Sequence, residues 1–377
     1  MKYDEKLFGP LWPFIENDDV TDIRWNGISL WITDLKKGKY CVANDYSEKK
    51  ENDGKKPLVL TKEFIESFCA KIAISVNENF NLSEPSLKAE TPDLRIQAEH
   101  SSISGVGRYT LSIRKTPCIS RLAGQDLVAN GYCIPIVDKL LPCLMRAHCS
   151  SVVTGDVGSG KTELEKYLVS FIPNNEAIVT VEDVLEMKIQ TLYPDKDCAS
   201  MRITDIFTAE HAIRDSLRLN TKWLILAEAR GREIMKVMEG ASTGCVALVS
   251  IHAENVWEIP DRIMNMAPEG TGEGFKNDVF TFFDVAIKVG IDFSHGVQRH
   301  ISQICFFDRE NEKNKTYIFL NEGKCNPYEI PDSLLKRFKN NGEVEFLVAL
   351  EKEKQRYDLK MQQEAEREAE REAERGE

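Results

Sequence analysis

The chain lacks any long apolar run. None of its 377 residues falls in an apolar stretch of about eighteen or more, the length a membrane-spanning helix needs, so no transmembrane helix is expected. The N-terminal sequence MKYDEKLFGPLWPF has neither the basic region nor the apolar stretch of a signal peptide. The ten cysteines are scattered, without a C-x-x-C pair or a zinc-type spacing. Such cysteines are typical of reduced thiols, so these absences favour a cytosolic protein.

Excess positive charge is also absent. The formal net charge is -12, so the long-range field of the chain repels nucleic acid. A local basic groove is compatible with this total, but we expect no direct nucleic-acid binding. The 42% hydrophobic content is ordinary for a globular protein, and the length suits two domains or three.

The first third of the chain, residues 1–117, is predicted to form an α+β domain. The stretch VTDIRWNGISLWITDL has the pattern of two strands joined by Asn26-Gly27, a dipeptide suited to the positive φ values of a hairpin turn. The polar insertion NDYSEKKENDGKKP is expected to be an exposed loop. After it, Thr61 precedes an apolar pattern of helical spacing, and GRYTLSIRK indicates a further strand.

Around TPCISRLAGQDLVANG the composition changes to proline, glycine and other turn-forming residues, and we expect the domain boundary there. Residues 118–330 then alternate helical segments with the apolar runs SSVVTG, EAIVTVED, KWLILAEA and VALVSIHAE, the pattern of βαβ units and a mostly parallel sheet. The stretch VAIKVGIDFSHGVQRHISQICFF predicts a hairpin after them. Residues 331–377 are expected to be a charged helical or disordered tail, because the repeated Glu-Ala-Glu-Arg unit offers no core face. A partner-binding arm is the alternative for this segment.

A complete phosphate-loop motif lies near the middle of the chain. Gly155 to Thr162 fits G-x-x-x-x-G-K-[ST], follows an apolar strand and opens a helical pattern. Backbone N–H groups of such a loop wrap the β-phosphate at the positive end of the following helix. Lys161 is expected to reach the β- and γ-phosphates, and Thr162 to hold Mg²⁺. An accidental glycine-rich turn is the alternative, and the flanking strand and helix argue against it.

Two acidic clusters follow predicted strands downstream of this loop. The first, in IVTVEDVLEMKI, carries Glu182, Asp183 and Glu186, and the second, in WLILAEARGRE, carries Glu228. A parallel sheet presents its ligands at the carboxyl ends of its strands, where hydrolysis needs carboxylates near the water and the metal. A single acid there is more often solvated surface. His252, at the end of another apolar strand, is either a γ-phosphate sensor or a hydrogen-bonded edge residue.

These motifs, in this order, resemble those of the secretion traffic ATPases of type II secretion, type IV secretion and type IV pili. GDVGSGKT is similar to the phosphate loop of the family, IVTVEDVLE to its acidic box, LILAEARGREIMKVMEGASTG to the segment around its second carboxylate, and SIHAEN to its histidine box. DVTDIRWNG and YTLSIRK resemble its N-terminal domain. The resemblance runs from about Asp19 to about Phe307 and is greatest to the type IV secretion and tight-adherence pilus branch. It implies a RecA-like P-loop NTPase domain of α/β class behind an α+β N-terminal domain.

The resemblance also implies roles for individual residues. Glu186 is the expected general base, with Glu182 and Asp183 supporting it and the metal. Glu228 is the expected second carboxylate near Mg²⁺, and His252 the sensor. Arg114 is the expected phosphate contact from the N-terminal domain, while Arg95 and Arg218 match positions where the family tends to carry arginine. The expected nucleotide-binding residues are Gly155, Asp156, Val157, Gly158, Ser159, Gly160, Lys161, Thr162, Glu163 and Arg114, and the expected metal-binding residues are Thr162, Glu182, Asp183 and Glu228.

Three positions depart from the family pattern. Ala227 stands where a glycine usually precedes the second carboxylate, residues 220–222 replace an expected Arg-Pro-Asp, and Cys245 occupies the position of the first histidine of the histidine box. The phosphate loop and both acidic boxes are intact, so we expect an active enzyme.

Members of this family are cytoplasmic hexameric rings that turn ATP hydrolysis into domain motion beneath a membrane channel. The resemblance therefore predicts an Mg²⁺-dependent ATPase at the inner face of the cell membrane, with membrane-embedded secretion or pilus components as partners. Type IV secretion or conjugative transfer is the expected task. Alternatives are a pilus assembly or retraction motor, a RecA-like nucleic-acid translocase, a small-molecule kinase and a degenerate binding module. A translocase requires basic pore loops, and residues 118–330 contain no Lys/Arg run.

Overall fold

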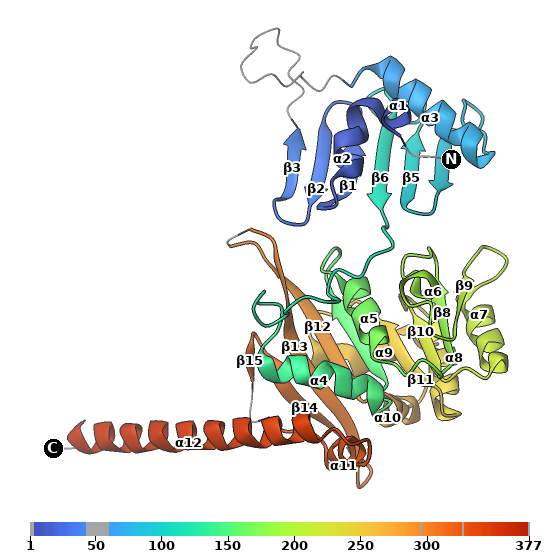
Figure 1. Cartoon of the computed structure of the whole chain (residues 1–377). Helices are drawn as coiled ribbons and strands as arrows, with labels where there is room; N and C mark the ends of the chain where they lie inside the picture. The colour runs from blue at the N-terminus through green and yellow to red at the C-terminus, as the bar shows by residue number, and fades with distance from the viewer. Residues whose placement is uncertain (1–3, 43–59, 295, 326–327, 376–377) are drawn as a thin grey trace. The chain divides into compact units, whose positions relative to one another are not determined.

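The computed structural model describes residues 4–42, 60–294, 296–325 and 328–375, and its chain divides into two compact units (Figure 1). The first unit comprises Met1–Cys118 with Phe293–Val297, and the second comprises Ile119–Asp292 with Gln298–Glu377. The polar insertion that the sequence predicts to be an exposed loop, residues 44–57, lies outside the described residues. Among the described residues, no helix is both long enough and apolar enough to cross a bilayer.

The first unit is built on an antiparallel sheet in the order β3-β2-β1-β6-β5-β4. The predicted hairpin is confirmed, because β1 and β2 pair in antiparallel register with Trp25 opposite Leu30. Gly27 has a φ of 91°, and the Asn26 side chain accepts hydrogen bonds from the N–H groups of Ile28 and Ser29. The strands are β1 (Val20–Trp25), β2 (Leu30–Asp34), β3 (Gly38–Val42), β4 (Ser86–Glu90), β5 (Leu94–Glu99) and β6 (Thr110–Lys115).

The helix predicted after Thr61 is α3 (Lys62–Val76), which covers this sheet. The Thr61 hydroxyl accepts a hydrogen bond from the Phe64 N–H at 3.1 Å, so it caps the helix as its type and position predict. The apolar stripe of α3 is buried in the core of the unit together with Phe8, whose ring packs against that of Phe68 in a tilted arrangement, with 5.3 Å between ring centroids. The short helices α1 (Glu5–Phe8) and α2 (Trp12–Glu16) precede the sheet.

The second unit is built on a mixed sheet in the order β15-β14-β13-β12-β7-β11-β10-β8-β9. The strands from β12 to β9 in this order are parallel, and β12, β13, β14 and β15 form an antiparallel extension. All four predicted parallel strands are present, and so is the predicted hairpin, as β12 and β13. The strands are β7 (Ser151–Gly155), β8 (Ile178–Glu182), β9 (Cys198–Arg202), β10 (Trp223–Leu226), β11 (Val246–Ser250), β12 (Val285–Asp292), β13 (Gln298–Glu310), β14 (Lys313–Asn321) and β15 (Lys324–Cys325).

Both faces of the parallel strands are buried under helices. In β10, Trp223 and Ile225 belong to one apolar core, while Leu224 and Leu226 belong to the other, because successive side chains of a strand point to opposite faces. Helices α4 and α5 cover the first face, and α7 to α10 cover the second (Figure 1). The helices of this unit are α4 (Pro135–Arg146), α5 (Lys161–Ser170), α6 (Ile189–Leu192), α7 (Ala209–Ser216), α8 (Glu233–Ser242), α9 (Ile259–Met266), α10 (Glu273–Phe282), α11 (Asp332–Asn340) and α12 (Val344–Arg375).

The sequence does not predict the edge strand β9, which the structure contains. Its five residues, Cys-Ala-Ser-Met-Arg, are partly exposed and contain no β-branched residue, so neither apolar alternation nor β-propensity indicates a strand. Pairing with β8, from Ile178 opposite Cys198 to Glu182 opposite Arg202, fixes its extended conformation. The strand is therefore a product of tertiary pairing rather than of its local sequence.

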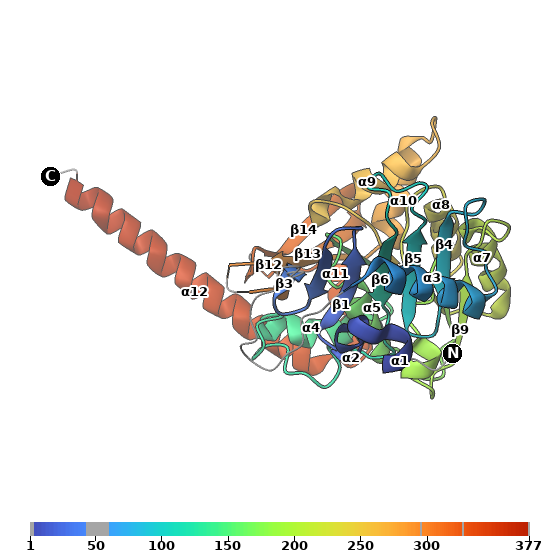
Figure 2. The ribbon, with the colours of Figure 1, turned by 90° about the horizontal axis from the view of Figure 1, so that it is seen from above.

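The C-terminal segment is helical, and its first part is packed into the second unit rather than detached from it. Phe338 of α11 and Phe346 of α12 meet edge to face at 5.5 Å and are both buried in the core that contains α4. The Arg146 guanidinium donates two hydrogen bonds of 2.6 Å to Glu343, and this contact lowers the pKa of the Glu343 carboxyl. From above, the long remainder of α12 extends past α4 (Figure 2).

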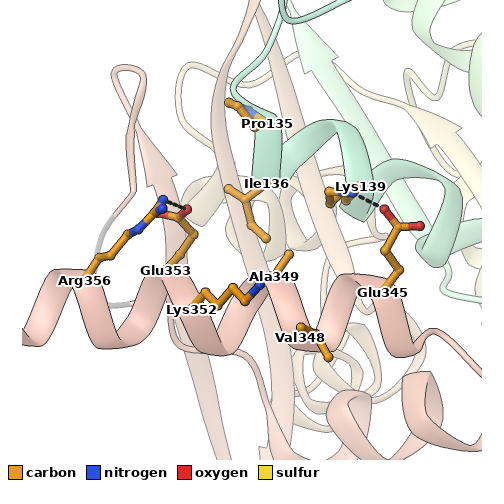
Figure 3. A pocket seen from close by; sticks show the side chains of 9 residues that line it. All are labelled: Pro135, Ile136, Lys139, Glu345, Val348, Ala349, Lys352, Glu353 and Arg356. Atoms are coloured by element: carbon orange, nitrogen blue, oxygen red, sulfur yellow. Dashed lines mark hydrogen bonds and ion pairs between the residues drawn. The ribbon is translucent and has the colours of Figure 1, made fainter.

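A shallow groove runs between α4 and the first turns of α12. Ile136 of α4 points toward Ala349 of α12, and Lys139 forms an ion pair with Glu345 (Figure 3). Because α12 contacts α4 along this groove, the helix continues the fold of the second unit before its charged repeat begins.

We predict that Phe346→Ala destabilises the second unit by about 3–5 kcal/mol, because a fully buried phenyl ring would leave a cavity. Val348→Ala, on the same helix but with a side chain that is 49% exposed rather than 1%, is the matched control, with an effect of about 0.5 kcal/mol or less. Thermal and urea unfolding of both variants measure the difference. Equal, small effects would show that α12 does not stabilise the unit.

Candidate nucleotide-binding site

The loop between β7 and α5 has a backbone that requires glycine. Gly155, Gly158 and Gly160 have φ values of 148°, 79° and 98°, a range that side chains disfavour. At Gly155 there is also no space, because a Cβ atom would lie 2.4 Å from the Val289 carbonyl oxygen and 2.6 Å from the Ser159 hydroxyl. The chain is thus held in a tight curve that ends at the N-terminus of α5.

The groups in this curve fit the phosphates of a nucleotide. The helix N-terminus offers unpaired N–H groups and a partial positive charge. The Ser159 hydroxyl is buried without a hydrogen-bond partner among the described residues. The Lys161 ammonium donates to the carbonyl oxygens of Gly155 and Asp156 at 2.9 and 3.3 Å, and burial lowers its pKa. A cation, a free hydroxyl and a glycine cradle therefore converge at the point where the motif predicts phosphate.

The remaining motif residues have distinct surroundings. Val157 is 78% exposed at the tip of the loop, and Thr162 lies half-buried in the first turn of α5. Glu163 accepts a hydrogen bond from the Arg121 N–H at 2.8 Å and forms an ion pair with Lys166 at 3.0 Å. Glu163 thus ties the segment before α4 to α5, so a direct contact with nucleotide stays a prediction for this residue.

Glu182, at the end of β8, is turned inward. Its side chain is buried, and one carboxylate oxygen accepts from the Thr180 hydroxyl at 2.9 Å. The other accepts from the N–H groups of Glu186 and Met187, each at 2.9 Å. Burial raises the pKa of Glu182, and these hydrogen bonds oppose that rise. Because both oxygens are engaged within the chain, the geometry favours Glu182 as a support for the turn that carries Glu186.

Asp183 and Glu228 lie at the solvent side of the same edge and are joined by an arginine. Arg230 contacts Asp183 Oδ2 at 2.8 Å and Glu228 Oε2 at 2.7 Å. The His252 ring nitrogen Nε2 lies 3.4 Å from the other oxygen of Glu228. The hydrogen bond from Arg230 lowers the pKa of Glu228, which keeps this carboxylate charged.

The segment with His252 is anchored to the strand of the phosphate loop. Thr154 Oγ1 of β7 donates to the Ala253 carbonyl oxygen at 3.1 Å and accepts from the Ala253 N–H at 3.0 Å. Arg262 of α9 donates to the His252 carbonyl oxygen at 3.2 Å. A shift of the histidine segment would therefore be transmitted directly to β7.

A buried acid lies beneath this site. Glu165 of α5 is fully buried, and neither carboxylate oxygen has a hydrogen-bond partner within the described residues. Burial and the nearby charge of Glu182 raise its pKa well above the usual range, although Lys161 opposes the rise. Burial therefore disfavours the charged form of this carboxyl under the phosphate loop.

The structure thus gathers most of the predicted residues at one edge of the sheet. The phosphate loop follows β7, Glu182 is the last residue of β8, and Glu228 and His252 lie just beyond the ends of β10 and β11. These four strands are neighbours in the sheet. In the described part of the chain, no group of three or more His, Cys, Asp or Glu side chains is placed to hold a metal ion. Mg²⁺ commonly takes one or two carboxylates and completes its shell with phosphate and water, which Glu228 and the Thr162 hydroxyl suit.

Cys245 and the predicted arginines lie elsewhere. Cys245 precedes β11, at the opposite end from His252, and its thiol contacts the Thr221 carbonyl oxygen at 3.0 Å. Arg218 lies in the turn η2 (Leu217–Leu219) before β10, at the amino end of the strand that leads to Glu228. Arg95 and Arg114 face each other across β5 and β6 of the first unit, where Arg114 pairs with Asp22 at 2.8 Å. A phosphate contact by Arg114 stays a prediction.

Two arginines with clear contacts were not expected from the sequence. Arg230 follows Glu228 by two residues, so the alternating acidic and basic residues of AEARGRE could have indicated an ion pair between them. Arg299 of β13 donates to the Gly158 carbonyl oxygen of the phosphate loop at 3.1 Å, across a separation of 141 residues. No local pattern indicates such a long-range contact.

Comparisons with known proteins identify the family of the chain. A family model described as "Type II/IV secretion system protein" matches residues 99–371. An uncharacterised Bacillus anthracis protein is 25% identical over 283 residues, which are 73% of this chain and 59% of that protein, so the chain spans less than two thirds of it. The type IV secretion system protein VirB11 of Brucella suis is 26% identical over 284 residues, 66% of this chain and 78% of VirB11.

The solved structure of the Legionella pneumophila ATPase DotB is similar in fold, with a TM-score of 0.58 at 14% identity, over 92% of this chain and 87% of DotB. This similarity confirms the predicted fold class, a RecA-like α/β domain with a preceding N-terminal domain.

We predict that His252→Ala lowers ATP turnover about tenfold, because Glu228 loses a neighbour that orients it. Cys245→Ser is expected to change turnover less than about twofold, because the thiol lies at the other end of β11 and packs in the fold. Phosphate release measures turnover, and the thermal midpoint of each variant controls for folding. Equal losses with the fold preserved would assign Cys245 a role in hydrolysis.

Proposed function

The chain belongs to the type II/IV secretion system protein family, and on that premise we propose that it is the ATP-hydrolysing motor of a type IV secretion or conjugative-transfer machine. The observation that carries the proposal is the complete phosphate loop beside Glu228 and His252, at the carboxyl ends of adjacent parallel strands. In open α/β sheets, ligands bind at this edge.

Each residue of the site has a separate role in hydrolysis. The backbone of the loop and the N-terminus of α5 hold the phosphates, and Lys161 places its charge on the transferring group. Thr162 and Glu228 would hold Mg²⁺, which supplies charge neutralisation at the β- and γ-phosphate oxygens. Glu186 accepts the proton of the attacking water, and Glu182 fixes the turn that presents Glu186.

His252 links the presence of the γ-phosphate to the position of the sheet strands. Its ring contacts Glu228, and the residue after it is hydrogen-bonded to Thr154 of β7. Loss of the γ-phosphate would change the surroundings of Glu228 and His252 together, and the paired hydrogen bonds pass that change to the strand that leads into the phosphate loop. This is a route from chemistry to motion within one unit.

The partners that we propose follow from the family. VirB11 is a type IV secretion system protein, and we propose that this chain also serves such a system. In this proposal it acts as a homo-hexamer against membrane-embedded secretion components at the inner membrane face. Hydrolysis by the same site would also suit a pilus motor. The in-cell test below distinguishes a secretion motor from a pilus motor by whether transfer or pili are lost when hydrolysis stops.

Lys161→Ala is predicted to lower phosphate release by about 30- to 1,000-fold and leave the fold intact, since one lost charge contact of this kind costs about 2–4 kcal/mol of transition-state stabilisation. Lys236→Ala changes a partly exposed lysine of α8 that pairs with Glu239, and this matched control keeps full turnover. Unchanged turnover in Lys161→Ala would contradict the proposed hydrolysis. In cells, loss of DNA or protein transfer with Lys161→Ala supports the secretion assignment, and loss of pili alone contradicts it.

Glu186→Gln is predicted to retain ATP binding but to slow hydrolysis by about 10²- to 10⁴-fold, because an amide does not accept a proton from water. A filter-binding assay with labelled ATP and single-turnover hydrolysis separate the two steps. Glu228→Gln is the comparison variant. Trapping of ATP by Glu228→Gln together with normal hydrolysis by Glu186→Gln would reverse the assignment of the base.

A further inference from the structure

Arg230 connects the two acidic clusters of the site. One guanidinium nitrogen contacts Asp183, one residue beyond β8, and another contacts Glu228, two residues beyond β10. The strands β8 and β10 are parallel neighbours, with Val181 opposite Leu226. The arginine therefore spans the gap between two adjacent strand ends.

The backbone around Arg230 is held in place, so the point from which its side chain starts is defined. The Glu233 carboxylate accepts hydrogen bonds from the N–H groups of Arg230 and Gly231 at the start of α8. A guanidinium is a planar fork whose nitrogens can engage two carboxylates at once, which a single ammonium does less well. The contact thus depends on an arginine at this position and not on positive charge alone.

Asp183 lies at the start of the turn that presents the proposed base. Its neighbour Glu182 closes this turn on the N–H groups of Glu186 and Met187. Through Asp183, Arg230 holds the first residue of the turn against Glu228. The base and the second carboxylate are consequently fixed relative to each other from both sides, by Glu182 within the turn and by Arg230 across the strands.

The two ion pairs are too exposed to stabilise the fold strongly. The Arg230 and Asp183 side chains are 63% and 49% exposed, and exposed pairs contribute about 0–1 kcal/mol to stability. What the bridge can change is geometry at the reacting groups, where a misplacement of about 1 Å can cost about 10²-fold in rate. Its effect is therefore expected in turnover and not in the melting temperature.

We propose that Arg230 is a positioning residue for the hydrolytic site, and that Asp183 acts through Arg230 rather than as a ligand of the metal. This inference rests on the proposed ATP hydrolysis. It assigns the acidic cluster after β8 two separate duties: Glu182 and Asp183 orient the turn, and Glu186 carries out the proton transfer.

A double-mutant cycle tests this inference. Asp183→Asn and Arg230→Gln are each expected to lower kcat about tenfold, with the KM for ATP and the half-saturating Mg²⁺ concentration changed less than about twofold. The double variant is expected to match the single ones, because both substitutions break the same bridge. Arg230→Lys should restore little of the rate. Arg232→Gln, an exposed arginine of the same segment, is the matched control and keeps wild-type kinetics.

Losses that multiply to about a hundredfold in the double variant, or a raised Mg²⁺ requirement in Asp183→Asn, would overturn the inference. Full rescue by Arg230→Lys would also overturn it, since charge alone would then suffice. If the wild type hydrolyses ATP and the variants do so equally well, this inference alone is wrong. If the wild type does not hydrolyse ATP, the proposed function is wrong.

Hydrogen exchange gives a readout that does not depend on turnover. Arg230→Gln and Asp183→Asn should both speed amide exchange in residues 183–187, while Arg232→Gln should not, and the thermal midpoints of all three should match the wild type. Unchanged exchange in residues 183–187 would contradict a bridge that positions the turn.

Discussion

The position of the site depends on the backbone conformation at Gly155 and on the space around that residue. There the chain leaves β7 with a φ of 148°, and the space that a side chain would need is already occupied by the carbonyl oxygen of Val289 in the neighbouring strand β12. The pairing of β7 with β12, in which Val289 is opposite Gly155, therefore determines where the loop begins. The position of Lys161 and the direction of α5 follow from that starting point, because only five residues separate them from Gly155.

Around this fixed point, the parallel sheet supplies the remaining chemistry. Each of β8, β10 and β11 ends at the same edge, and a polar side chain of the site lies at or just beyond the end of each. Glu182 holds its own turn, Glu228 meets Arg230 and His252, and Thr154 binds the segment of His252 to β7. The site is therefore a set of strand ends joined to one another by hydrogen bonds, which makes it sensitive to small shifts between strands.

The sequence was informative where the cause of the structure is local. The Asn26-Gly27 turn, the cap at Thr61, the buried strands and the glycine loop each follow from residue types within a few positions, and all are present. It was less informative where distant segments meet. Strand β9 depends on β8, α12 packs on α4, where Glu345 pairs with Lys139, and Arg299 reaches Gly158 over 141 residues. The inward turn of Glu182 also depends on tertiary contacts, since an acid after an apolar strand is equally consistent with an exposed side chain.

The central claim is that the chain turns over ATP rather than only binding it, and continuous phosphate release by the purified chain tests it most directly. With ATP and Mg²⁺ in excess, the account predicts release that continues well beyond one phosphate per chain and ceases when the metal is chelated. Stoichiometric ATP binding without phosphate release, by a folded protein, would contradict the account and leave a nucleotide-binding module.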